Sequence, residues 1–239
     1  MQRLLLHLLI TALLIAFPLT DFAHNTYFPP DTVVNGIASK NYMWLYNIPW
    51  EWKVEVPVAT LNYYQQKARP KWTGEYSYYS KYIDPADRGI SAVARGLKET
   101  LTEAKNTYTW NTDQEIMFVV SMIQQLRFVP DSTMGYRDYE KYPVETLFDG
   151  YGDCEDKAIL AAALLKRLGY DVALLFLETP DKQRSHIALG AAIPTRSTGN
   201  YFSHGAKRYY YIETTFAGWR IGEIPAEWQG LAAVVIPVD

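Results

Sequence analysis

Cysteine is almost absent from this chain of 239 residues, in which Cys154 is the only one. A chain with a single cysteine cannot form an internal disulfide, so this thiol requires another explanation. The histidines are few and scattered, which argues against a metal site built from cysteine and histidine. No glycine-rich phosphate-binding motif, internal repeat or low-complexity linker is present. The net charge of −3 gives no reason to expect a nucleic acid partner.

Long hydrophobic runs are also missing, except at the N-terminus. One positive charge precedes an apolar run from Leu4 to Leu19, which is the layout of a secretory signal. As a helix this run would span roughly 24 Å, which is shorter than the ~30 Å core of a bilayer. Asp21-Phe22-Ala23 is a poor cleavage motif, so an uncleaved membrane anchor stays open beside a cleaved signal. Both alternatives place the rest of the chain outside the cytoplasm, and the second associates it with a membrane.

The remainder has the composition of a globular protein, with 49% hydrophobic and 21% charged residues. We divide it into an aromatic-rich N-terminal region, residues 24–111, and a core, residues 112–239. Residues 41–82 alternate aromatic and polar positions and are expected to form short strands with irregular connections. Helical spacing of apolar residues then predicts a helix that ends near residue 105.

The core begins with helices and ends with strands. Thr112 and Glu115 form a capping-box pattern that opens a helix, and residues 129–149 are expected to form a loop. A third helix should run from Cys154 to Gly169. The spacing of apolar residues then changes from that of a helix to that of a strand. Four segments show the strand spacing, residues 170–178, 184–193, 207–214 and 232–238. This order predicts an α+β fold in which the third helix packs on an antiparallel sheet.

Cys154 follows a turn that contains two glycines, in Gly150-Tyr-Gly-Asp-Cys-Glu-Asp156. Asp153 is a good N-cap residue, so Cys154 falls in the first turn of its helix. At that position the helix dipole and free backbone N–H groups favour the reactive thiolate. The charges of Glu155 and Asp156 should raise the thiol pKa unless they point away. The alternative is a buried cysteine that acts as a small hydrophobic residue.

A thiol nucleophile needs a base, and the base needs a group that orients it. Among the histidines only His186 lies in a predicted strand, on the face that also carries Ala188 and Gly190, small residues that leave room for a helix end. Glu213 lies at the end of the next predicted strand, and it can reach the imidazole if the two strands form a hairpin. The alternatives are a structural or solvated histidine and a surface acid.

With these residues in place, the sequence resembles the transglutaminase-like cysteine peptidase superfamily. Matching motifs occur in family order at residues 142–156, 161–171, 185–190 and 211–215. The resemblance implies a papain-like α+β core in which Cys154 is the nucleophile, His186 the base and Glu213 the orienting acid. The family usually has aspartate at this last position. It also implies an oxyanion hole made of the Cys154 backbone N–H and the Gln124 side-chain amide. An exposed polar role for Gln124 on its helix stays open.

We therefore expect an extracytoplasmic cysteine hydrolase that cleaves an amide bond in a polypeptide substrate through a thioester acyl-enzyme. A transamidase and a non-catalytic binding module on the same fold are the alternatives. No cofactor and no metal are predicted. Some bacterial periplasmic relatives with the same Asp-Cys-Glu-Asp string bind calcium, and Asp153, Glu155 and Asp156 could supply its oxygen ligands. The same three residues also suit a helix N-terminus, so calcium stays an alternative.

Overall fold

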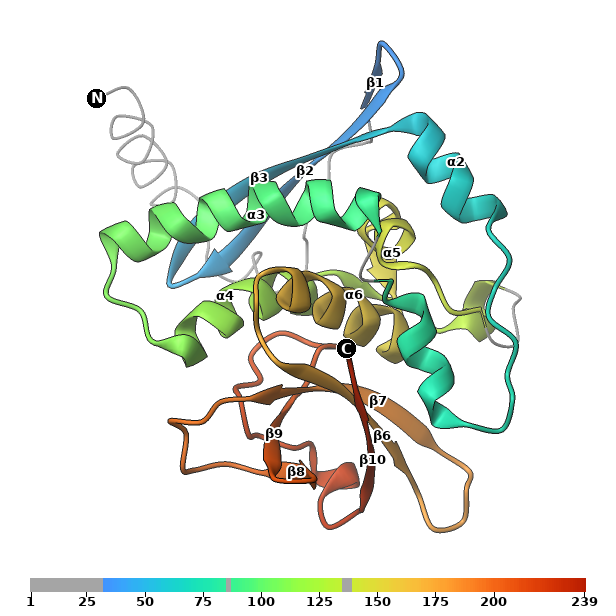
Figure 1. Ribbon diagram of the computed structural model, residues 1–239, viewed down its shortest axis with the longest axis vertical. Helices are drawn as coiled ribbons and strands as arrows, with labels where there is room; N and C mark the ends of the chain where they lie inside the picture. Colours follow the sequence, from blue (N-terminus) through green and yellow to red (C-terminus); the bar gives the residue numbers. More distant parts are fainter. Residues whose placement is uncertain (1–31, 85–86, 135–138) are drawn as a thin grey trace.

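The computed structural model describes residues 32–84, 87–134 and 139–239 (Figure 1). The expected signal or anchor, residues 1–23, lies outside the described residues, as does the start of the region expected at 24–111. Within the described part of the chain, no helix combines the length and the apolarity needed to cross a bilayer.

The centre of the fold is a five-stranded antiparallel sheet with the strand order β10-β6-β7-β9-β8. Its strands are β6 (Val172–Glu178), β7 (Ser185–Ala192), β8 (Tyr201–His204), β9 (Lys207–Ile212) and β10 (Ala233–Pro237). Four of these strands lie in the segments that the sequence predicts to be strands. The pattern does not predict β8, because this four-residue edge strand lies between the turn-forming glycines Gly199 and Gly205.

Both faces of this sheet are covered. On one face, α6 (Cys154–Arg167) packs against β6 and β7, where Leu174 and Leu189 belong to the main hydrophobic core. Figure 1 shows α6 lying across the sheet. On the other face a second cluster contains Tyr209 and Trp228. Because both faces are buried, β6 and β7 are composed mostly of apolar residues. The fold is α+β, and the helix that begins at Cys154 packs on an antiparallel sheet as predicted.

Two helices predicted before residue 129 are confirmed, namely α3 (Arg88–Thr107) and α4 (Thr112–Gln124). The cap of α4 differs from the prediction by one residue. Asn111 is the N-cap, and its side chain accepts the amide hydrogen of Gln114 at 3.0 Å. The Gln114 side chain accepts the amide hydrogen of Asn111 in return. The reciprocal bonds predicted for Thr112 and Glu115 are therefore made one residue earlier, by Asn111 and Gln114.

A helix also forms within residues 129–149, where the sequence pattern predicts only a loop, so that prediction is wrong. This helix, α5 (Pro143–Asp149), has proline at its first position. The Glu145 carboxylate accepts the Tyr142 amide hydrogen at 2.9 Å. The helix ends at Gly150, whose φ of 73° is the left-handed conformation that favours glycine. These start and stop signals are local, but the surrounding Pro, Tyr and Gly residues obscure them.

The N-terminal region forms a hairpin that is longer than the predicted short strands. Its elements are β1 (Thr32–Val34), β2 (Ile37–Tyr46), β3 (Ile48–Pro57) and the following α2 (Val58–Gln66). The Trp44 indole donates a hydrogen bond to the Phe118 carbonyl of α4 at 3.2 Å. The buried core thus continues across residue 111, where the sequence predicts the boundary between the N-terminal region and the core. That boundary stays a prediction.

The hairpin also supports the end of α5. Lys40 and Tyr42 on β2 donate side-chain hydrogen bonds to the backbone carbonyls of Phe148 and Leu147. The last carbonyls of a helix have no partner within the helix, so these bonds satisfy groups that would otherwise be buried alone. The N-terminal region therefore helps to position the chain segment that leads to Cys154.

Candidate active site

The chain segment before Cys154 is held by close packing. β4 (Arg127–Phe128) and β5 (Tyr151–Gly152) form a short parallel pair. A Cβ atom on Gly152 would lie 2.6 Å from the Cβ atom of Asp156, so only glycine allows this approach. Asp153 follows as the N-cap, and Cys154 is the first residue of α6, as predicted.

The structure brings His186 and Glu213 together. β7 and β9 are antiparallel neighbours whose pairing ends at Leu189 and Ile212, so Glu213 directly follows the last paired residue of β9. The His186 Nε2 atom lies 3.0 Å from the Glu213 Oε2 atom, and both side chains are buried. The two strands are therefore neighbours as predicted, and their pairing brings the carboxylate to the imidazole. They do not form a hairpin, because β8 lies between them in the chain.

The Glu213 carboxylate is surrounded by donors. Besides His186, it accepts hydrogen bonds from the Tyr211 hydroxyl, the amides of Thr214 and Thr215, and the Thr215 hydroxyl. Burial raises the pKa of Glu213, but His186 and Thr215 outweigh it and lower the pKa to about 2. Glu213 is thus ionised at neutral pH, and His186 Nε2 must donate the hydrogen in their bond. A neutral His186 then has Nδ1 as its basic nitrogen.

Cys154 lies beside the same strand and is partly exposed. The backbone amide of Ile187, the residue after His186, interacts with the thiol. The thiol itself donates a hydrogen bond to Glu155 Oε2 at 2.9 Å, and among the described residues no hydrogen bond joins it to His186. Burial raises the pKa of Cys154, and the neighbouring Glu155 raises it further. Glu155 therefore does not point away from the thiol, and its charge adds to the effect of burial.

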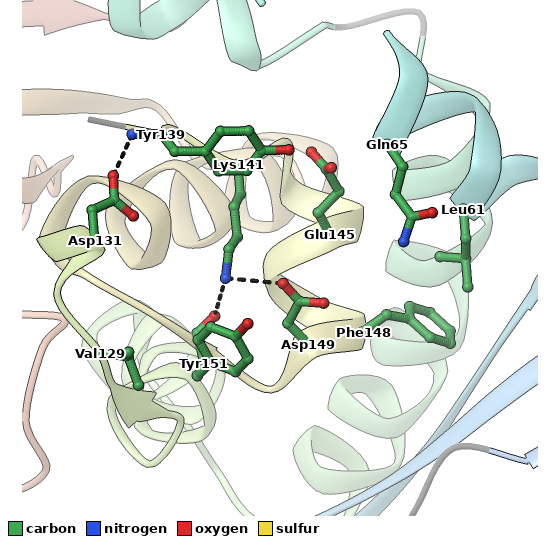
Figure 2. A pocket seen from close by; sticks show the side chains of 10 residues that line it. All are labelled: Leu61, Gln65, Val129, Asp131, Tyr139, Lys141, Glu145, Phe148, Asp149 and Tyr151. Carbon is green, nitrogen blue, oxygen red and sulfur yellow. Dashed lines mark hydrogen bonds and ion pairs between the residues drawn. The ribbon is translucent and has the colours of Figure 1, made fainter. Parts of the chain in front are cut away.

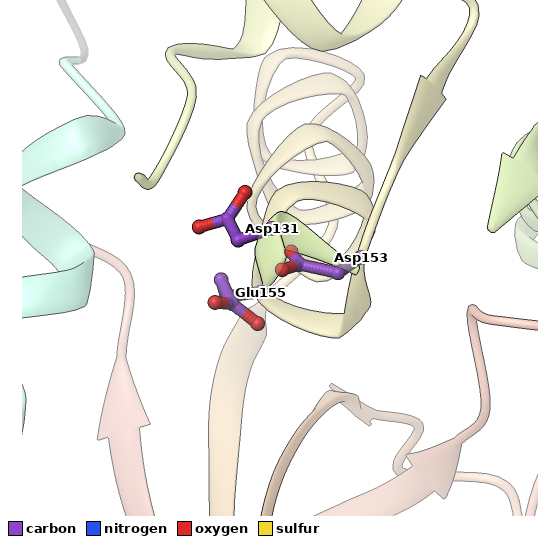
Figure 3. A group of neighbouring side chains, drawn as sticks. All are labelled: Asp131, Asp153 and Glu155. Atoms are coloured by element: carbon purple, nitrogen blue, oxygen red, sulfur yellow. The ribbon is translucent and has the colours of Figure 1, made fainter. Parts of the chain in front are cut away.

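Three carboxylates lie together next to Cys154. Asp131, Asp153 and Glu155 each contribute an oxygen atom, and these atoms are within 4.8 Å of one another. Figure 3 shows Asp131 close to Asp153 and Glu155, the two acids that flank Cys154 in the sequence. Asp153 Oδ1 is buried and has no hydrogen-bond partner. Burial and the nearby Asp131 raise the pKa of Asp153 to about 6. Such a set of oxygen ligands fits a hard divalent cation.

This cluster differs from the calcium ligands considered from the sequence. Asp156 is not part of it, because its carboxylate accepts the Lys141 amide hydrogen at 2.7 Å and lies 3.9 Å from the Lys141 ammonium. Asp131 takes its place from η2 (Asp131–Met134). No spacing rule relates Asp131 to Cys154, so the sequence pattern could not identify it.

Gln124 is buried, so an exposed polar role on its helix is wrong. Its side-chain amide nitrogen donates to the backbone carbonyl of Glu213 at 2.8 Å and to that of Trp219 at 3.0 Å. These two bonds use both amide hydrogens. Gln124 thus binds the chain at Glu213 and again at Trp219, the two ends of one segment. Its role in the oxyanion hole stays a prediction.

Lys157 is completely buried one turn after Cys154, and no sequence pattern marks it as part of the site. Its ammonium nitrogen lies 3.3 Å from the Gln124 carbonyl, 2.9 Å from that of Leu126 and 2.6 Å from that of Thr215. Burial lowers the pKa of Lys157 to about 7, and Glu213 opposes that effect. Below this pH the ammonium has one hydrogen for each carbonyl. Lys157 therefore joins α6 to the end of α4 and to the segment after Glu213.

Trp228 covers the imidazole. Its ring stacks on His186 with a centroid distance of 5.2 Å and an interplanar angle of 9°. Trp228 belongs to η3 (Ala226–Trp228), and only 9% of its surface is exposed. The indole therefore shields one face of His186 from water. The sequence contains no signal for this contact, because η3 and β7 are far apart in the chain.

A separate cavity of about 260 Å³ lies beside the carboxylate cluster and shares Asp131 with it. In Figure 2 the Lys141 ammonium points into this cavity, where it pairs with Asp149 at 2.9 Å and with the Tyr151 carbonyl at 3.2 Å. Neither Cys154 nor His186 lines it. The charged groups that line this cavity have partners within the protein, so the cavity is distinct from the site around Cys154 and His186.

No family model and no curated protein matches the chain. Similar solved structures include Legionella pneumophila LapG, with 19% identity, coverage of 65% of this chain and 78% of that chain, and a TM-score of 0.41. Calcium-bound LapG has 20% identity, 66% and 81% coverage, and a TM-score of 0.41. A Cytophaga hutchinsonii protein described as a candidate cysteine protease has 11% identity, 87% and 70% coverage, and a TM-score of 0.41. Likenesses this weak do not assign an activity to this chain.

Replacement of Glu213 by glutamine should make the protein less stable at neutral pH. The pKa of this carboxyl falls from 4.5 to about 2 on folding, so its stabilising effect is present above pH 4.5 and disappears as the pH falls toward 2. At about 1.36 kcal/mol per pKa unit, the loss is about 3 kcal/mol. Urea unfolding from pH 7 to pH 2 should show a gap between wild type and Glu213→Gln that closes in acid. The exposed Glu99→Gln variant should show no such gap, and a gap independent of pH would contradict the assignment.

Replacement of Lys157 by methionine should leave three buried carbonyls without a partner. We expect the free energy of unfolding at pH 6 to fall by roughly 3 kcal/mol. Lys166, on the same helix, is a matched control, because its ammonium donates to one carbonyl, that of Val238, at 2.7 Å and is only partly buried. Lys166→Met should cost about 1 kcal/mol or less. Equal losses in the two variants would show that Lys157 does not join the three segments.

Proposed function

We propose that this protein is an extracytoplasmic cysteine hydrolase of the transglutaminase-like type, which cleaves an amide bond in a polypeptide. The observation that carries the proposal is the buried His186–Glu213 pair, 3.0 Å apart, in which His186 lies on the strand beside the Cys154 thiol. A thiol, an imidazole and a buried carboxylate are the groups that nucleophilic acyl transfer requires. The extracytoplasmic location and any membrane association rest on residues 1–23 alone.

In the proposed reaction, Glu213 stays ionised and holds the Nε2–H tautomer of His186. Nδ1 removes the proton from Cys154, whose thiol must first leave Glu155. The sulfur then attacks the substrate carbonyl, and the backbone N–H of Cys154 at the start of α6 stabilises the oxyanion. The imidazolium returns its proton to the leaving amine, and a thioester remains. Water then attacks the thioester with His186 as base, which releases the acid and restores the thiol.

We further propose that Asp131, Asp153 and Glu155 hold a hard divalent cation such as calcium. The unpartnered, buried Asp153 Oδ1 supports this proposal, because an isolated buried carboxylate oxygen is costly. The two positive charges would offset most of the repulsion among the three carboxylates. The calcium-bound form of LapG is consistent with this choice of ion. The chain's own residues carry every step of the proposed reaction.

The reaction can be tested on a proteome-derived peptide library analysed by mass spectrometry. The wild type should generate new free N- and C-termini, Cys154→Ser should generate none, and His186→Ala should lower the rate by about 10²-fold or more. His204→Ala, in an exposed histidine of β8, is the matched control and should be as active as the wild type. Added amines trapped as amide products would identify a transamidase. Turnover that survives Cys154→Ser would contradict both enzymatic readings, and binding without turnover by the wild type would favour a binding module.

The cation proposal predicts that calcium stabilises the folded protein. At saturating calcium the melting temperature should rise by about 5 °C. Asp131→Asn should lose this response and, without calcium, should melt higher than the wild type because one repelling charge is gone. Asp149→Asn is the matched control, because Asp149 pairs with Lys141 in the neighbouring cavity and should keep the full calcium response. A full response in Asp131→Asn would contradict the proposed ligands.

A further inference from the structure

Two phenylalanines lie side by side next to the candidate active site. The rings of Phe128 and Phe216 are 5.3 Å apart, with an interplanar angle of 43°. Phe216 is 56% exposed, and Phe128 is partly buried. A single exposed apolar side chain is ordinary on a protein surface. The position of this pair is what distinguishes it.

Each phenylalanine is attached to a segment that carries a reacting group. Phe128 in β4 is the Cα partner of Gly152 in β5, which lies two residues before Cys154. Phe216 directly follows Thr215, whose amide and hydroxyl bind the Glu213 carboxylate. The aromatic pair therefore connects the segment of the nucleophile to the segment of the orienting acid.

The backbone under the pair is held firmly. The Lys157 ammonium binds the Leu126 carbonyl, two residues before Phe128, and the Thr215 carbonyl, next to Phe216. The amide of Val129, next to Phe128 on the other side, donates to the Gly152 carbonyl at 3.1 Å. A surface held in this way before the substrate arrives loses little entropy on binding.

We propose that Phe128 and Phe216 form a subsite for an apolar side chain of the polypeptide substrate, within one or two residues of the scissile bond. The subsite rests on the proposed function and adds a substrate class to it. An extended peptide advances about 3.3 Å per residue. A substrate whose scissile bond lies at Cys154 would therefore bring a side chain to the surface of Phe128 and Phe216 within one or two residues of that bond. An apolar side chain would cover the exposed ring of Phe216 and leave water.

The single thiol allows a test that does not require a known substrate. Iodoacetamide and N-benzyl iodoacetamide both alkylate Cys154, but only the second reagent carries an apolar group for the subsite. For each reagent, the rate constant at Cys154 is divided by the rate constant for free cysteine. The ratio of the benzyl value to the iodoacetamide value should exceed one. Phe216→Ala and Phe216→Lys should lower this ratio by about 10-fold. Tyr201→Ala, in an aromatic residue that is 41% exposed on β8, should leave it unchanged.

The outcomes separate the subsite from the proposed function. If Cys154 reacts with both reagents but Phe216 variants keep the wild-type ratio, the subsite is overturned and the hydrolase proposal stands. If the native thiol reacts with neither reagent and reacts only after unfolding, both fall. A second readout is the set of peptides cleaved from the library, in which Phe216→Lys should lose an apolar preference at one position near the cut. An unchanged cleavage profile would also overturn the subsite.

Discussion

The buried ammonium group of Lys157 lies where three parts of the fold meet, and the geometry of the candidate active site depends on it. Through hydrogen bonds to backbone carbonyls it joins α6, the helix that begins at Cys154, to the end of α4 and to Thr215. Gln124 adds a second connection, because its side chain binds the carbonyl of Glu213 while its own carbonyl binds Lys157. Residues that are far apart in the sequence are thus held by hydrogen bonds that are shielded from water, where such bonds are strong.

The carboxylates of the site occupy two opposite environments. Glu213 accepts hydrogen bonds from backbone, hydroxyl and imidazole donors, and its pKa falls to about 2. Asp153 is also buried and Glu155 is partly buried, but they lie against other acids, so desolvation and repulsion raise their pKa values. Hydrogen-bond donors of the protein therefore offset the cost of burying the charge of Glu213. For the cluster with Asp131 the protein supplies only oxygen ligands, which is the arrangement expected of a cation site.

The sequence predicts those parts of the site that depend on local pattern. The start of α6 at Cys154 follows from a cap and a turn, and the approach of Glu213 to His186 follows from the pairing of two recognisable strands. Lys157, Asp131 and Trp228 escape prediction because their roles depend on contacts between distant segments. The small residues next to His186 were expected to make room for a helix end. Gly190 instead makes room for Tyr209 and Leu175, since a Cβ atom there would lie 2.9 Å from Tyr209.

The thiol of Cys154 shows why a helix start alone does not make a reactive cysteine. Its position favours the thiolate, but burial and Glu155 raise its pKa, and in this structure it donates its hydrogen to Glu155. In the proposed reaction, activation comes from proton transfer to His186, which binds Glu213 and is covered on one face by Trp228. In this structure the acceptor of the thiol hydrogen is a carboxylate next to it in sequence. The proposed reaction requires the imidazole of His186 to replace that carboxylate as the acceptor.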